Sequence, residues 1–203
     1  MTRARPDQPP DDARHDVWLV RHGETEWARL GRHTGRTDIP LTDVGRAQAR
    51  TLGRRLAGHP FALVLTSPLS RAAETAALAG FEDEAQPDPD LQEWDYGAFE
   101  GRLTSDIRTE LPGWTIWDGP WPGGETIEEV AARADRVIAR LRQADGDALV
   151  VAHGHLLRVL AARWLDLAPT AGGLFALGTA TISILGWERE RAVIEAWNDE
   201  ADR

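Results

Sequence analysis

The sequence contains no cysteine and no lysine. Without cysteine, the chain can form no disulfide and offers no thiol nucleophile, so a reducing compartment, the cytoplasm, is the expected location. Without lysine, it has neither the Gly-Lys pair of a nucleotide-binding P-loop nor a Schiff-base nucleophile. Three common ways of handling phosphate or carbonyl groups are therefore excluded, and every long basic side chain is arginine.

Long apolar runs and an excess of positive charge are also missing. No run approaches the ~20 apolar residues of a membrane span, so we expect no membrane partner. The formal net charge of −10 argues against a nucleic-acid partner, although a few convergent cations could still bind an anionic substrate. The start of the chain lacks the apolar segment of a secretory signal. Its composition predicts a disordered tail over residues 1–15, followed by one domain over residues 16–203.

Three short apolar runs are each followed by polar or cationic residues. The runs are residues 16–20, 61–65 and 148–152, and the residues that follow are Arg21-His22, Ser67 with Arg71, and His153. Runs bounded in this way are typical of buried parallel strands. Ligands bind at the carboxyl ends of the strands in open α/β sheets, so we expect these polar residues to share one edge.

Helical patterns lie between the apolar runs. Thr42 is a predicted N-cap for a helix that ends near Gly58. Ser67-Pro68 predicts the N-cap and first residue of a second helix. A capping box begins at Thr126, and residues 156–165 form a further apolar helix pattern. Strands that alternate with helices predict an α/β layer fold, and residues 181–188 and 192–197 predict a terminal hairpin.

Two irregular segments interrupt these patterns. Residues 111–124 are rich in Pro, Gly and Trp, and we expect an ordered lid or crossover there rather than a mobile linker. Residues 80–93 are strongly acidic, and runs of this kind are typical of solvated loops. Within them, Asp88-Pro89-Asp90 has the spacing of the paired aspartates that one class of phosphatases uses. That class needs the pair at the end of an apolar strand, and the preceding residues EDEAQP do not form one.

The predicted edge gathers two guanidinium groups and two imidazoles, those of Arg21, Arg71, His22 and His153. This set suits a dianionic, tetrahedral ligand such as phosphate, because arginine offers paired donors and helix N-termini add backbone N–H groups. In a chain without cysteine or lysine, the nucleophile available in this set is a histidine.

Five motifs, in order along the chain, resemble those of the histidine phosphatase superfamily, which includes the phosphoglycerate mutases. They are residues 21–25 (RHGET), 33–42 (HTGRTDIPLT), 66–72 (TSPLSRA), 91–97 (LQEWDYG) with Glu100-Gly101, and 152–155 (AHGH). The match spans about residues 17–197. The resemblance implies a three-layer α/β/α phosphoglycerate mutase-like fold, with a mostly parallel central sheet and a C-terminal antiparallel hairpin.

The resemblance also implies catalytic roles. His22 would attack phosphorus and form a phosphohistidine, with Gly23 letting the backbone approach the phosphate. Arg21, Arg71 and His153 would hold the equatorial oxygens. Glu93 would protonate the leaving oxygen and then accept a proton from water. A dianionic phosphate beside Glu93 would favour its protonated form, which implies an acid-to-neutral optimum.

Further residues are implied as substrate contacts. They are Thr34 and Gly35 in the substrate loop, Ser67, Tyr96, His33, His155 and Arg158. No carboxylate has a clear metal-ligand spacing to the histidines, so we expect neither a metal nor another cofactor. The expected partner is a small phosphorylated metabolite, and a homo-oligomer is an open possibility because related proteins often form dimers.

Three functions remain as hypotheses. Residues 91–97 and 152–158 are similar to the branch that includes sedoheptulose-1,7-bisphosphatase and bacterial acid phosphatases, so hydrolysis of small phosphomonoesters is the first. A cofactor-dependent phosphoglycerate mutase is the second, but those enzymes have Asn at the position of Ala28, Trp at that of Arg36, and a longer insertion with Lys and Arg. Here that insertion carries only Arg102 and Arg108. A non-catalytic phospholigand-binding module is the third, although every core catalytic residue is present.

Overall fold

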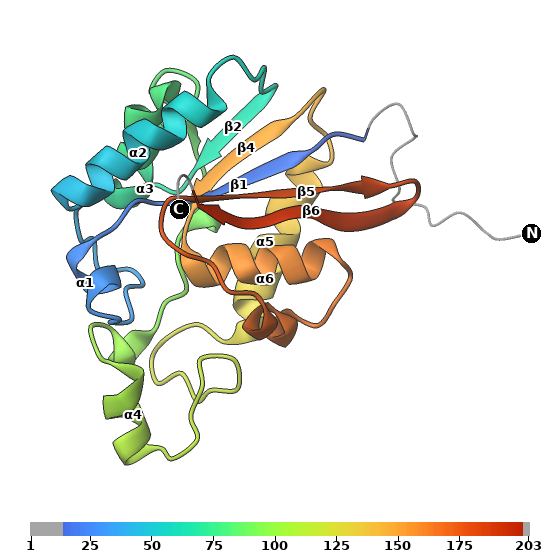
Figure 1. Ribbon diagram of the computed structural model, residues 1–203. Helices are drawn as coiled ribbons and strands as arrows, with labels where there is room; N and C mark the ends of the chain where they lie inside the picture. The colour runs from blue at the N-terminus through green and yellow to red at the C-terminus, as the bar shows by residue number, and fades with distance from the viewer. Residues whose placement is uncertain (1–13, 201–203) are drawn as a thin grey trace, which may run out of the picture.

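A six-stranded sheet in the order β3-β2-β4-β1-β5-β6 forms the centre of the molecule (Figure 1). The computed structural model describes residues 14–200. The strands are β1 (Val17–Arg21), β2 (Leu63–Thr66), β3 (Gln86–Pro87), β4 (Ala148–Ala152), β5 (Thr181–Glu188) and β6 (Arg191–Glu200). Strands β3, β2, β4 and β1 run parallel, while β5 is antiparallel to β1 and β6 to β5. The expected sheet and terminal hairpin are confirmed.

Helices cover both faces of the sheet (Figure 1). Helices α2 (Asp43–Leu56) and α3 (Ser70–Ala76), which continues into η2 (Ala77–Phe81), lie on one face, and α5 (Ile127–Leu141) and α6 (Gly154–Trp164) lie on the other. The shorter helices are α1 (Glu26–Arg29), α4 (Thr104–Glu110), η3 (Pro89–Leu91), η4 (Gly97–Phe99) and η5 (Pro169–Leu174).

Strand β4 shows how the sequence produces these layers. Its side chains alternate between faces, as in any strand. Leu149 and Val151 join the apolar cluster under α2 and η2, whereas Ala148, Val150 and Ala152 join the cluster under α5 and α6. Because all five are buried, β4 needs an uninterrupted apolar run, and the predicted three-layer α/β/α architecture follows.

The start of α3 differs from the prediction. The helix begins at Ser70, three residues beyond the expected N-cap Ser67. The Ser67 hydroxyl instead lies 2.7 Å from His153 Nε2. The carboxylate of Asp38, from a distant loop, accepts the Ser70 N–H at 3.0 Å and so caps the helix. A tertiary contact therefore replaces the local cap.

The Trp-rich segment 111–124 is an ordered crossover, as expected. The indoles of Trp114 and Trp121 donate to the carbonyl groups of Pro120 and Ile116, and Trp121 packs on the buried Trp94 with ring centroids 5.8 Å apart. These internal hydrogen bonds and ring contacts explain why the segment has a defined conformation without regular secondary structure.

The ends of the chain bear on two further expectations. Apart from Arg14 and His15, the predicted tail over residues 1–15 lies outside the described residues. No helix within residues 14–200 combines the length and the apolar character needed to cross a membrane.

Two glycines allow the loop after β1 to lie directly on the first turn of α2. A Cβ atom at Gly23 would be 2.4 Å from the carbonyl oxygen of Gly45, and one at Gly45 would be 2.2 Å from that of Glu24. Gly23 is therefore needed for backbone packing, and its expected role in letting the backbone approach phosphate stays a prediction.

We predict that Gly45→Ala lowers the free energy of unfolding by about 1–3 kcal/mol, because backbone must move to relieve the overlap. Val44→Ala, at a neighbouring position that is 55% exposed, should change it by less than about 0.5 kcal/mol. Urea unfolding of both variants measures the difference. Equal stability of the two variants would contradict the packing argument.

Candidate active site

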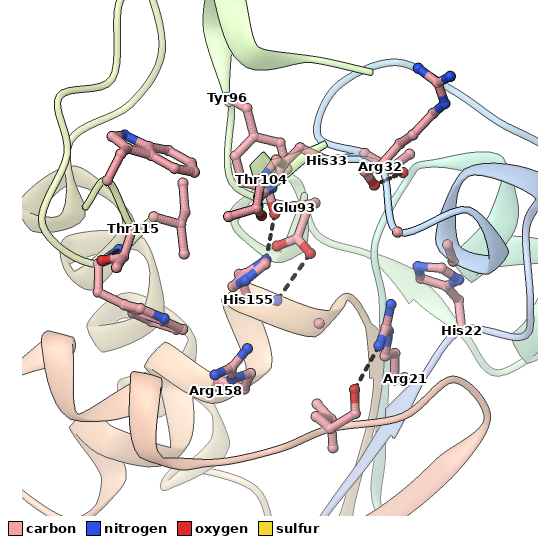
Figure 2. Close-up of a pocket in the computed structure, with 18 of the residues that line it drawn as sticks. Arg21, His22, Arg32, His33, Glu93, Tyr96, Thr104, Thr115, His155 and Arg158 are labelled. Carbon is pink, nitrogen blue, oxygen red and sulfur yellow. Dashed lines mark hydrogen bonds between the residues drawn. The ribbon is translucent and has the colours of Figure 1, made fainter. Parts of the chain in front are cut away.

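A cavity of about 400 Å³ opens where β1 and β4 end (Figure 2). Figure 2 shows His22 and Arg21 on one side and Arg158 on the other, with Glu93 between them. Four arginines line the cavity, and Glu93 is the one carboxylate among its described lining residues. The arginines are Arg21, Arg32, Arg108 and Arg158. The cavity is thus strongly cationic in a chain of net charge −10.

His22 is the buried imidazole at the end of β1. Its Nδ1 lies 2.7 Å from the Gly23 carbonyl oxygen. A carbonyl can only accept, so Nδ1 carries the proton and Nε2 keeps its lone pair. Burial lowers the pKa of His22 well below 6.5, and the charges of Arg71 and Arg21 lower it further, whereas the Gly23 hydrogen bond opposes them. The neutral, nucleophilic form is therefore favoured.

Three buried nitrogen atoms near His22 have no hydrogen-bond partner among the described residues: Arg21 Nε, Arg71 Nε and His153 Nδ1, of which the last carries a proton when the Ser67 hydroxyl donates to His153 Nε2. The rings of His153 and His22 lie 5.1 Å apart between centroids. Burial and the charge of Arg71 lower the pKa of His153 well below 6.5. Unpaired buried N–H groups cost free energy, so this cluster is suited to an anion that accepts from all of them.

Arg71 and Arg21 are each anchored by other atoms of the same guanidinium. Arg21 Nη1 donates to the Leu177 carbonyl at 2.6 Å. Arg71 donates to the carbonyl groups of Thr34, Gly35 and Thr37 at 3.3, 2.8 and 3.1 Å. Burial lowers the pKa of both arginines, while the charge of Glu93 raises it. The anchors fix the orientation of each unpaired Nε.

Glu93 is held at the N-terminus of α6. Its Oε1 accepts the N–H groups of Trp94 and Leu156 at 2.9 Å each, and its Oε2 accepts that of His155 at 3.0 Å. The carboxylate is 4% exposed. Because Oε1 accepts two N–H groups and Oε2 only one, Oε2 keeps the freer lone pair.

The far part of the cavity is aromatic and polar. The Tyr96 hydroxyl lies 2.6 Å from His155 Nδ1, and His33 Nε2 lies 3.1 Å from the Thr104 hydroxyl. Arg158 stacks over Trp117 at 4.6 Å. Burial raises the pKa of Tyr96 well above 10, so the phenol stays protonated.

The residues expected to contact substrate fall into two groups. Those that line the cavity are His33, Thr34, Tyr96, His155 and Arg158. Ser67 and Gly35 are outside the lining, as are the catalytic candidates Arg71 and His153: Ser67 bonds to His153, and a Cβ at Gly35 would be 2.0 Å from Glu100. Their direct contact with substrate stays a prediction.

Other lining residues carried no sequence signal for the site. Arg32, Arg108, Thr115 and Leu177 lie in segments without a motif. Trp114 and Trp117, from the Trp-rich segment 111–124, form part of the cavity wall. Of the two basic residues in the insertion, Arg108 lines the cavity, whereas Arg102 pairs with Glu110.

A comparison with family models agrees with the geometry. The model of the histidine phosphatase superfamily (branch 1) matches residues 17–200. The chain belongs to the histidine phosphatase superfamily. The RHG motif at the end of β1 and the second histidine after β4 therefore have the placement that the resemblance implied.

Curated relatives within the histidine phosphatases include hydrolases and mutases. An acid phosphatase of Mycobacterium tuberculosis is 41% identical over 187 residues, covering 89% of this chain and 92% of the relative. Sedoheptulose 1,7-bisphosphatase of Saccharomyces cerevisiae is 37% identical, covering 73% and 67%. A 2,3-bisphosphoglycerate-dependent phosphoglycerate mutase of Gloeobacter violaceus is 34% identical, covering 74% and 76%. The expected similarity to the phosphatase branch is confirmed.

A solved histidine phosphatase structure supports the fold. The product of a Mycobacterium tuberculosis open reading frame has a TM-score of 0.87 and 39% identity, covering 92% of this chain and 98% of that one.

We predict that the protein loses stability in acid because His22 and His153 are buried in their neutral form. Their pKa values lie below the ordinary 6.5, so the unfolded chain binds more protons below pH 6.5 and unfolding becomes easier as pH falls. Each histidine contributes about 1.4 kcal/mol per pH unit until its folded pKa is reached. The free energy of unfolding, measured with urea at several pH values between 7 and 5, should therefore fall less steeply with falling pH in His153→Asn, by this amount per pH unit. An unchanged pH dependence would contradict the conclusion that His153 is buried in its neutral form.

Proposed function

We propose that the protein is a phosphomonoesterase that hydrolyses small phosphorylated metabolites through a phosphohistidine on His22. The observation that carries the proposal is the unprotonated Nε2 of His22 beside three unpaired buried donors. One group can attack phosphorus while the others hold its oxygens. The absence of cysteine supports the cytoplasm as the place where it acts.

In the first step, His22 Nε2 attacks the phosphorus atom and the bond to the ester oxygen breaks. Arg21, Arg71 and His153 stabilise the charge on the three equatorial oxygens. His153 can donate from Nδ1 when the Ser67 hydroxyl donates to its Nε2, a pair 2.7 Å apart. Glu93, protonated at Oε2, gives its proton to the departing alkoxide, which leaves as an alcohol.

In the second step, water attacks the phosphohistidine from the position that the alcohol has left. The Glu93 carboxylate takes a proton from the water as the new P–O bond forms and the P–N bond breaks. Inorganic phosphate leaves, and His22 returns to its neutral form with Nε2 unprotonated. Because the cavity is open to solvent, water can reach this position.

The features of the cavity favour hydrolysis over mutase activity. Arg36, which stands where mutases have Trp, points its Nη2 at Glu125 at 3.4 Å and is outside the cavity lining. Ala28, at the mutase Asn position, leaves that part of the wall apolar. Arg108 alone represents the basic residues of the mutase insertion in the cavity.

We predict phosphate release from sugar phosphates or p-nitrophenyl phosphate that survives EDTA and falls to background in His22→Ala, because the nucleophile is lost. His59→Ala serves as the control, since His59 pairs with Asp147 and lies outside the cavity. Phosphoglycerates are assayed in parallel. Isomerisation of 3-phosphoglycerate that depends on the bisphosphate cofactor would assign a mutase instead, and phosphate binding without turnover would assign a binding module.

We also predict an acid-to-neutral optimum for kcat/KM. The lowered pKa of His22 keeps Nε2 unprotonated well below pH 6.5, and the general acid must hold its proton when the dianionic ester is bound. Initial rates from pH 4 to 9, taken at each pH on protein shown to be folded, measure the profile. A rate that still rises above about pH 8 would contradict the role of Glu93 as the acid.

A further inference from the structure

A row of arginines on α5 holds the acidic segment that precedes Glu93. Arg133, Arg136 and Arg140 recur at helical spacing and so share one face of α5. Arg136 donates to both carboxylate oxygens of Asp90, and Arg140 donates to Asp88 and Gln86. The segment expected to be a solvated loop is therefore tied to a helix along this part of its length.

Arg133 differs from the other two because it is buried and grips backbone. It is 7% exposed, and its Nη1 donates to the carbonyl groups of Asp90 at 2.6 Å and Gln92 at 2.9 Å. Its Nε and Nη2 form a fork on the two carboxylate oxygens of Glu125 at 2.8 and 2.9 Å. Four of the five guanidinium N–H groups are thus used.

Glu125 continues this grip on the other side of Glu93. Its Oε2 accepts the Asp95 N–H at 2.9 Å, and its own N–H donates to the Asp95 carbonyl at 3.0 Å. Its carbonyl accepts the indole N–H of Trp94 at 2.8 Å. Arg133 therefore holds two carbonyl groups in the segment before Glu93, and Glu125 holds the two residues after it.

We propose that the pair of the buried Arg133 and the partly buried Glu125 is a positioning device for Glu93, which sets the carboxyl group at the correct place for proton transfer to the leaving oxygen. This inference rests on the proposed function, because it assumes that Glu93 is the general acid. Neither residue lines the cavity, so the pair acts only through the backbone that carries Glu93.

The pair is charged in this position. Burial raises the pKa of Glu125, but the hydrogen bond and charge of Arg133, together with the Asp95 N–H and the charge of Arg36, more than offset this effect, so the pKa lies below its usual range. Removing Arg133 would take both hydrogen bonds of the fork from Glu125 and leave its carboxylate with the Asp95 N–H at 2.9 Å and the Arg36 guanidinium at 3.4 Å. Directional hydrogen bonds thus hold the backbone on both sides of Glu93, whereas apolar packing alone would leave its position less closely defined.

The experiment compares a good and a poor leaving group. The p-nitrophenolate ion departs without a proton, whereas an alkoxide needs one, so only the alkyl ester depends on the acid. We expect Arg133→Gln to lower kcat/KM for glycerol phosphate about tenfold to hundredfold, and for p-nitrophenyl phosphate less than about threefold. Glu125→Gln, which keeps the side-chain shape, should show the same selectivity and replaces Arg133→Gln if that variant does not fold.

Two further variants separate positioning from general stability. Arg163→Gln removes a similar fork between α6 and α5, in which Arg163 Nε and Nη2 donate to Asp135 at 2.9 and 3.1 Å. It should lower the two kcat/KM values equally or not at all. Arg133→Lys, which keeps the charge but not the fork, should be intermediate and should retain the leaving-group selectivity.

Glu93→Gln distinguishes the possible failures. It should show the strongest selectivity, with a loss of at least about a hundredfold on glycerol phosphate. If Glu93→Gln is selective but Arg133→Gln and Glu125→Gln lower both substrates equally, the pair is merely structural and the inference is wrong, while the proposed function stands. If Glu93→Gln itself shows no selectivity, the acid assignment fails and the inference fails with it.

Discussion

The burial of two arginines with unpaired Nε–H groups beside a neutral histidine is the constraint on which the rest of the structure depends. Cations are costly to remove from water unless they are paired. The hydrogen bonds of Arg21 and Arg71 run from their terminal nitrogens to carbonyl groups, and the Asp38 carboxylate lies 3.8 Å from Arg71 Nη1. Their Nε–H groups have no partner among the described residues and are suited to donate to an anion. The sheet, the glycine contact between β1 and α2, and the substrate loop hold this incomplete arrangement in place before any ligand arrives.

In the proposed mechanism, a second set of oriented groups acts on the leaving oxygen. The N-terminus of α6 supplies two of the N–H groups that hold the Glu93 carboxylate, and α5 holds the backbone on both sides of it through Arg133 and Glu125. Phosphoryl transfer requires little covalent chemistry from the protein but close control of position. Two helices of the same layer therefore have different roles in the proposed mechanism: α6 orients the carboxyl group of Glu93, and α5 orients the backbone that carries this residue.

The parts that could be predicted from sequence are those whose cause is local. The apolar runs of β1 and β4 specify buried strands, and the polar residues after them, His22 and His153, meet because parallel strands end at one edge. The start of α3 could not be predicted, because its cap is Asp38 from a distant loop. The same holds for Arg32 and Arg108 in the cavity wall, which no spacing relates to His22. The groups around phosphorus thus come from motifs, whereas much of the wall facing the leaving group comes from irregular segments.

The same burial that prepares His22 for attack also limits the conditions in which the fold is stable. A neutral imidazole in a cationic cavity stays nucleophilic at acidic pH. At the same pH, however, His22 binds a proton in the unfolded chain and not in the folded chain, so acid favours unfolding. In the proposed site, phosphate would accept from the unpaired donors only in the folded state, so its binding would oppose this loss of stability by mass action. Substrate binding would therefore make the protein more resistant to acid. At low pH the ligand-bound protein should have a higher free energy of unfolding than the free protein, and the difference should grow with ligand concentration.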